Sequence, residues 1–218
     1  MLSFEKLFHF QMDFQLKHPF TCIVAGPESC GKTSFVKSLL ENVTNMVDAP
    51  PDNIIWCYGE FQKNSLTTLP EAVNLAEGLR LDAINPQKRN LIIIDDLMTE
   101  VKNDKDVTSL FTKGSHHKNV SVILILQNIF YQGKELRTIG LNSHYIVLFK
   151  NPRDASQITH FAKQMYPGNV GFMQDAFRQA TVEPHGYLFV DLKQSTPEHF
   201  RLRTCVLPNQ QTIVFIPK

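Results

Sequence analysis

The stretch IVAGPESCGKTS, residues 23–34, decides which fold this sequence can adopt. Its Gly26 is followed by four residues and then by Gly31, Lys32 and Thr33, which is the pattern G-x-x-x-x-G-K-[ST]. An apolar run ends at Gly26, and apolar residues recur at helical spacing after Thr33, so the pattern lies between a strand and a helix. In that setting the glycines let successive backbone N–H groups point inward at phosphate oxygens. The stretch therefore predicts a loop that binds the phosphates of a nucleotide.

Individual residues of this loop have separate expected roles. We expect Lys32 to reach the β- and γ-phosphate oxygens and the Thr33 hydroxyl to bind Mg²⁺, so the expected cofactors are ATP and Mg²⁺. Nucleotide binding is predicted for the whole loop: Gly26, Pro27, Glu28, Ser29, Cys30, Gly31, Lys32, Thr33 and Ser34.

Two adjacent acids end an apolar strand expected over residues 90–98. Asp95 is predicted to hold the magnesium ion, directly or through water, and Asp96 to orient or deprotonate an attacking water. A second acid here favours hydrolysis over simple retention of a nucleotide. Because strands often end in acids, two solvated turn residues are the alternative, but pairing with the upstream loop favours the catalytic interpretation.

Gln127 comes at the end of the most apolar strand of the chain, expected over residues 120–128. A polar side chain there would lie between the loop and the acids, where it could bind the γ-phosphate or its water and act as a sensor of hydrolysis. The alternative is that Gln127 merely begins a loop. Three strands that deliver loop, acids and sensor to one edge fit ligand binding at the carboxyl ends of a parallel sheet.

Strand and helix patterns alternate along the chain, which predicts an α/β fold. We expect a P-loop NTPase three-layer sandwich, with a mostly parallel central sheet and a C-terminal strand pair. The expected strands cover residues 20–26, 53–60, 90–98, 120–128, 144–151, 186–192 and 200–207. The expected helices cover residues 32–45, 107–113, 154–165 and 169–180, with helical turns around 71–79.

The chain of 218 residues is long enough for one substantial domain. We expect residues 1–18 to form an N-terminal arm, 19–192 the core, and 193–218 a C-terminal strand and tail. Phe4, Phe8, Phe10 and Phe14 suit an arm that packs on this core or, alternatively, on a neighbouring subunit.

Composition limits the possible partners and compartments. Net charge is +1, from 22 Lys and Arg against 21 Asp and Glu, so no gross basic excess indicates a protein that coats nucleic acid. No apolar run approaches the about 20 residues that a membrane span needs, and no membrane partner is expected. The four cysteines lack metal-site spacing, which predicts free thiols in a reducing, intracellular compartment.

Four segments together resemble the viral genome-packaging ATPases of the FtsK/HerA superfamily. The resemblance is greatest to the poxvirus-type branch, which is found in large DNA viruses, virophages and Polinton/Maverick transposons, and it covers about residues 19–189. The segments are HPFTCIVAGPESCGKTS (18–34), LIIIDDL (91–97), VSVILILQNIF (120–130) and LNSHYIVLFKNPRDASQI (141–158).

This resemblance implies an additional-strand (ASCE) P-loop core, a homo-oligomeric ring, and ATP-driven movement of double-stranded DNA into a capsid without sequence preference. A capsid or portal component would be a partner, and the setting would be the host nucleus or cytoplasm, with association to the virion. By motif, Asp95 carries over as the magnesium acid, Asp96 as the base and Gln127 as the sensor. One departure is that many members of the superfamily have Glu where this chain has Asp96, so the attacking water would have to lie closer.

Ring motors of this kind usually take an arginine from the neighbouring subunit to neutralise charge that develops on the γ-phosphate. Arg137 is the expected residue and Arg153 the alternative, since both follow the sensor strand. Either could instead be a surface charge.

Two other functions stay open at this stage. A small-molecule or nucleoside kinase would fit the length, although few arginines cluster in the loops and Asp96 favours water as the phosphoryl acceptor. A nucleotide-gated assembly or switch subunit would use ATP mainly as a structural ligand.

Overall fold

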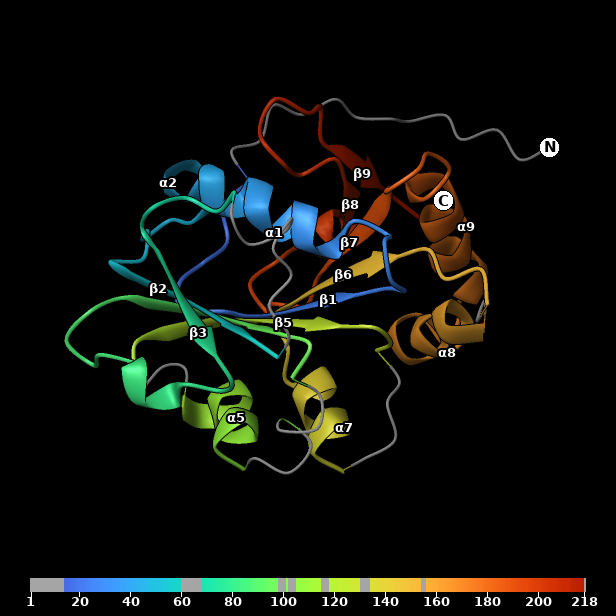
Figure 1. Cartoon of the computed structure of the whole chain (residues 1–218). Coiled ribbons are helices and arrows are strands. Elements are labelled where there is room, and N and C mark those ends of the chain that lie inside the picture. The colour runs from blue at the N-terminus through green and yellow to red at the C-terminus, as the bar shows by residue number, and fades with distance from the viewer. Residues whose placement is uncertain are drawn as a thin grey trace.

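A mixed β-sheet forms the middle layer of the protein, and helices cover both of its faces (Figure 1). The computed structural model describes residues 14–59, 68–97, 101, 105–114, 118–129, 134–153 and 156–217, of which 113, 114 and 134 by backbone alone. In this part of the chain the sheet has nine strands in the order β3-β2-β4-β5-β1-β6-β7-β8-β9. They are β1 Thr21–Ala25, β2 Asn53–Tyr58, β3 Val73–Glu77, β4 Asn90–Asp95, β5 Val120–Leu126, β6 Tyr145–Phe149, β7 Tyr187–Asp191, β8 Leu202–Thr204 and β9 Ile213–Phe215.

The six strands from β3 to β6 in this order are parallel, and β7, β8 and β9 are antiparallel. β5 lies between the loop-bearing strand β1 and the acidic strand β4, as the additional-strand topology predicts. The mostly parallel α/β sandwich is therefore confirmed. The expected C-terminal pair is present as β7 and β8, and β9 extends it with a third antiparallel strand that, at three residues, is too short to give a periodic pattern.

The helices divide between the two faces of the sheet (Figure 1). Side chains of α1 pack with one set of strand residues, and those of α5, α7, α8 and α9 pack with the alternate set. The α-helices are α1 Lys32–Glu41, α2 Val43–Met46, α5 Lys105–Ser109, α7 Lys134–Leu141, α8 Ser156–Met165 and α9 Val170–Ala180. Shorter turns are η1 Leu81–Ala83, the π-helix η2 Leu110–Gly114 and η3 Glu198–Phe200.

Both faces of the central strands are buried, which explains why they form unbroken apolar runs in the sequence. On β4, Ile92 and Ile94 belong to the core under α5, α7, α8 and α9, whereas Leu91 and Ile93 belong to the core under α1. Asp95 continues the second series, so its side chain lies on the α1 face of the sheet.

The helix expected over residues 32–45 is interrupted. α1 ends at Glu41, and a separate turn, α2, begins at Val43. The Asn42 side chain donates to the carbonyl oxygen of Ser38 at 2.9 Å, and this local bond competes with continuation of the helix.

The helical turns expected around residues 71–79 are wrong, because this segment contains the edge strand β3. β3 pairs in parallel with β2, with Ile54 opposite Val73 and Tyr58 opposite Glu77. Pairing along one side leaves Leu75 41% exposed, so the segment lacks the apolar run of a central strand. Backbone pairing decided its conformation, and the side-chain pattern did not indicate it.

The described end of the expected N-terminal arm packs on the core. Leu16 is 1% exposed and forms a parallel bridge with Val47. The Phe14 ring lies edge-on to Phe189, with ring centroids 4.8 Å apart, and Arg203 lies over the same ring at 4.9 Å. Phe4, Phe8 and Phe10 fall outside the described residues.

The four cysteines are free thiols, as predicted, and Cys22 and Cys57 are buried in the two cores. None of the helices in the described part of the chain is both long and apolar enough to span a bilayer.

Asp191→Ala is expected to destabilise the protein by about 3–5 kcal/mol, because Arg203 would keep a buried charge without its partner. The two side chains are 7% and 8% exposed, and their N···O distance is 3.1 Å. Urea unfolding measures the effect. The control is Asp52→Ala, which breaks an exposed pair with Arg89 and should leave the unfolding midpoint nearly unchanged. Equal shifts in the two variants would contradict the prediction.

Candidate functional site

The loop between β1 and α1 is strongly curved, so that its backbone N–H groups point toward the inside of the curve. Ser29 and Gly31 have left-handed backbone conformations, with φ of 58° and 110°. The Gly26 N–H donates to the carbonyl oxygen of Leu126 at 3.1 Å, which ties the start of the loop to the end of β5. Alternation of left-handed and ordinary residues before a helix creates a concave anion site, and the ten-residue helix α1 adds its positive end.

Two glycines of this loop lack room for a side chain. A Cβ on Gly26 would lie 2.6 Å from Cβ of Phe149 and 2.6 Å from Sγ of Cys30. A Cβ on Gly31 would lie 3.3 Å from His185, and its φ already disfavours other residues. The loop is therefore packed directly against the end of β6.

Lys32 points back over the loop. Its ammonium group donates to the carbonyl oxygens of Gly26 and Pro27, each at 2.7 Å. When a nucleotide binds in the loop, the Lys32 ammonium group can replace its hydrogen bonds to these two carbonyl oxygens with bonds to phosphate oxygens.

Asp95 is a mostly buried carboxyl group at the end of β4. Burial, followed by repulsion from Asp96, raises its pKa to about 6, while attraction to Lys32 acts in the opposite direction. The Lys32 and Asp95 charges are therefore near enough to interact. A lysine of the loop and an acid at the end of β4 therefore lie close together, and their roles stay predictions.

Trp56, the only tryptophan of the chain, is a neighbour of Asp95 that sequence reasoning missed. It lies opposite Ile93 in the β2–β4 ladder, two residues before Asp95 and on the same face. The indole N–H is fully buried and completes no hydrogen bond with the described residues, yet its approach to the carboxylate lowers the pKa of Asp95. An indole N–H aimed at an acid stabilises the anionic form, which is the form that binds metals.

Asp96 turns away from the sheet. It adopts a left-handed conformation, with φ of 55°, and its side chain is exposed. Gly59, next to the end of β2, makes this turn possible, because a Cβ there would lie 2.8 Å from the carbonyl oxygen of Asp96. The second acid therefore lies beside the first but in solvent.

Gln127 directly follows β5 and is exposed. Because β5 lies between β4 and β1, Gln127 emerges between Asp95 and the loop. The structure thus brings Lys32, Asp95, Asp96 and Gln127 to one edge of the sheet.

The two candidate arginines lie on segments that follow β5 and β6. Arg137 is exposed in the first turn of α7, and no ion pair links it to another described residue. Arg153 is exposed after β6, where its N–H donates to Oδ1 of Asn151 at 3.1 Å. The choice between them stays a prediction.

His185 is a second residue that the sequence did not indicate. Its Nδ1 donates to the carbonyl oxygen of Cys30 at 3.1 Å, so the turn before β7 touches the phosphate loop. The two residues are 155 positions apart. No spacing rule predicts such a contact, because it arises only when β7 pairs beside β6.

The residues present fit a magnesium ion held together with phosphate. Thr33 supplies a hydroxyl in the first turn of α1, and Asp95 supplies a carboxyl group whose pKa is raised by burial and by a second acid. A divalent cation would offset this repulsion, and Mg²⁺ commonly takes one or two protein oxygens beside phosphate and water.

Fold and loop together define an α/β P-loop NTPase fold. No family model matches the sequence, and no curated protein is similar to it in sequence. Solved structures do share the fold. The DNA-packaging ATPase B204 from Sulfolobus turreted icosahedral virus has a TM-score of 0.55 at 10% identity, over 93% of this chain and 100% of that chain.

The genome packaging NTPase B204 from Sulfolobus turreted icosahedral virus 2 gives similar values. In complex with ATP-gammaS it has a TM-score of 0.51 at 11% identity, covering 91% of this chain and 97% of that chain. In complex with AMPPCP it has a TM-score of 0.51 at 12% identity, covering 81% and 94%. The resemblance stated from the sequence is confirmed at the level of fold.

Asp95→Asn is expected to stabilise the nucleotide-free protein. The pKa of Asp95 rises from 3.8 to about 6 on folding, so the folded state binds more protons between these values, and stability falls as pH rises through them. The cost is complete above pH 6 and amounts to about 3 kcal/mol. Asparagine stays neutral and avoids this cost.

Urea unfolding at pH 5 and pH 8 tests the prediction, with a gain about twice as large at pH 8. Asp96→Asn is the matched control: it removes only the repulsion between the two acids and should give a smaller gain. A pH-independent effect of Asp95→Asn, or a loss of stability, would contradict the assignment of a buried charge.

Proposed function

We propose that this chain is an ATP-hydrolysing motor subunit that moves double-stranded viral, or virus-like, DNA into a capsid. The observation that carries the proposal is the meeting of Lys32 and Asp95 at the edge where β1, β5 and β4 end. The packaging role is supported by the shared fold with the DNA-packaging ATPase B204.

Residues 26–34 bind the triphosphate in this proposal. The inward N–H groups of the loop take the β-phosphate, and Lys32 moves from the carbonyls of Gly26 and Pro27 to the phosphate oxygens. The ammonium group of Lys32 would thereby exchange neutral carbonyl acceptors for negatively charged phosphate oxygens, which form stronger hydrogen bonds.

Thr33 and Asp95 hold Mg²⁺ in the proposed site. A bound Mg²⁺ would neutralise charge on the phosphates and orient them for in-line attack. The indole N–H of Trp56 favours the anionic form of Asp95 and partly offsets the effect of burial, as outer groups do around metal ligands.

Asp96 and Gln127 act on the attacking water. Asp96 is exposed and next to the metal acid, so it can accept the proton of a water aligned with the γ-phosphate. Gln127 holds the same water through its amide and changes partners when the γ-phosphate leaves.

Asp96→Asn is expected to lower the ATP turnover rate by about 10²-fold or more while nucleotide binding is retained, because it removes the base and not the phosphate contacts. Phosphate release, measured with and without duplex DNA, gives the rate. Lys32→Ala should instead abolish binding. Asp82→Asn is the control, an exposed acid paired with Arg80 outside the site.

An unchanged rate in Asp96→Asn would contradict the proposed base. Transfer of the γ-phosphate to an added nucleoside, without release of inorganic phosphate, would favour a kinase. Slow hydrolysis that ignores DNA, together with nucleotide-dependent assembly, would favour a switch subunit.

Arg137 is expected to act across a subunit boundary. A mixture of Lys32→Ala and Arg137→Ala subunits should then recover activity that neither has alone, because an intact loop of one can meet an intact arginine of the other. In an equal, random mixture, about a quarter of the subunit boundaries combine an intact Lys32 with an intact Arg137, so up to about a quarter of the sites should be active. Lys32→Ala mixed with Arg153→Ala serves as the comparison, and recovery there alone would reverse the assignment.

A further inference from the structure

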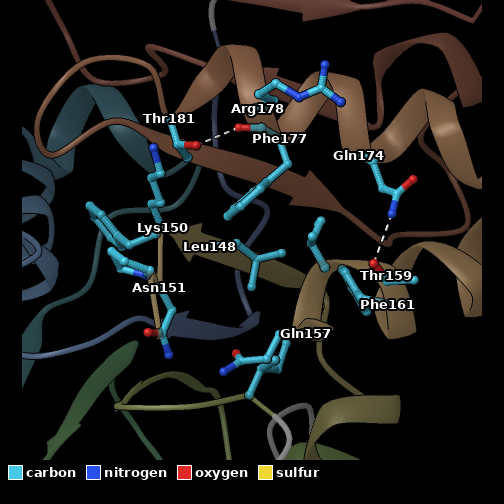
Figure 2. Close-up of a pocket in the computed structure, with 14 residues that line it drawn as sticks. Leu148, Lys150, Asn151, Gln157, Thr159, Phe161, Gln174, Phe177, Arg178 and Thr181 are labelled. Atoms are coloured by element: carbon cyan, nitrogen blue, oxygen red, sulfur yellow. Dashed lines mark hydrogen bonds between the residues drawn. The ribbon is translucent and has the colours of Figure 1, made fainter. Parts of the chain in front are cut away.

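A cavity of about 540 Å³ opens at the carboxyl end of β6, between that strand and helices α8 and α9 (Figure 2). This volume lies within the range of roughly 300–1,000 Å³ that is typical of small-molecule sites. No pattern in the sequence indicates this cavity, and the proposed roles of the phosphate loop, Asp95, Asp96 and Gln127 do not involve it.

The walls of this cavity are apolar and its rim is polar. Leu148, Phe161 and Phe177 supply hydrophobic surface, and Figure 2 shows the Phe177 ring pointing toward Leu148 across the space. Asn151 and Gln157 bring two side-chain amides to one end. Each amide presents both a donor and an acceptor.

The cavity and the phosphate loop share a wall. In the β1–β6 ladder Ala25 lies opposite Leu148, so the loop begins beside Phe149, against which Gly26 is packed. On the other side, Thr181 lines the cavity at the end of α9, and His185 four residues later bonds to the loop. The strand β6 and the turn that follows α9 therefore both touch the loop.

We infer that this cavity receives the purine base of the nucleotide whose phosphates the loop binds; the inference rests on the proposed function. A purine has flat, weakly polar faces and a hydrogen-bonding edge. Aromatic and aliphatic walls suit the faces, and the amides of Asn151 and Gln157 suit the edge. Lys150 and Arg178 also line the cavity, so an anion is the competing occupant, and the tripolyphosphate arm of the test below separates it from a base.

Base binding here would make α8 and α9 part of the nucleotide site. ATP should then bind at least about tenfold more tightly than inorganic tripolyphosphate, which contacts only the loop. Purine nucleoside triphosphates should also bind more tightly than pyrimidine ones, because the larger ring system covers more of the apolar wall.

Ile158→Trp tests the inference, because Ile158 lines the cavity and a larger side chain would fill it. Binding of ATP and of tripolyphosphate is measured by calorimetry in the presence of Mg²⁺. The variant should lose the about tenfold advantage of ATP and keep its affinity for tripolyphosphate. The matched control is Gln164→Trp, on an exposed position of the same helix outside the cavity.

The possible outcomes separate this inference from the proposed function. Failure of the wild-type protein to bind either ligand overturns both. Binding of both ligands with no ATP advantage, or an advantage that survives Ile158→Trp, overturns the base site alone. Equal losses of both ligands also overturn it, because the tripolyphosphate contacts should not depend on the cavity.

A second measurement needs no variant. Photolabelling of the wild-type protein with 8-azido-ATP should attach the base to peptides from α8, α9 or the segment 148–152, in competition with ATP. Labelling confined to other peptides would overturn the inference.

Discussion

The insertion of β5 between β1 and β4 is the constraint on which the site depends. Ile125 of β5 lies opposite Asp95 on one side and Val24 on the other. Asp95, the residue after β5 and the first residue of the loop therefore leave the sheet within two residues of the same level. Parallel strands end at a common edge, so this register brings together groups that lie far apart in the chain.

Several features at this edge of the sheet lower the stability of the folded protein without nucleotide. A buried carboxyl group with a raised pKa, an indole N–H without a hydrogen-bond partner among the described residues, and a left-handed Asp96 each cost free energy in the protein without nucleotide. Elsewhere the buried Arg203 is paired with Asp191, whereas the buried Tyr166 hydroxyl also lacks a partner among the described residues. The cost at Asp95 differs from the others because a bound cation would offset it, and such costs are typical of functional sites.

The sequence predicted the features that depend on local pattern. The loop, the acidic strand and the apolar run before Gln127 each carry their signal within a few residues. Trp56 and His185 could not be predicted, because their contacts depend on which strands become neighbours. The same reason explains the edge strand β3, whose conformation comes from pairing with β2.

The most direct measurement of the central claim is the affinity of Asp95→Asn for ATP-gammaS with Mg²⁺ and with EDTA. If Asp95 and the phosphate loop share one metal-bound triphosphate, the substitution weakens binding in Mg²⁺. In EDTA it leaves affinity unchanged or raises it, because a negative charge beside a polyanion has been removed. Equal effects under both conditions would contradict the account.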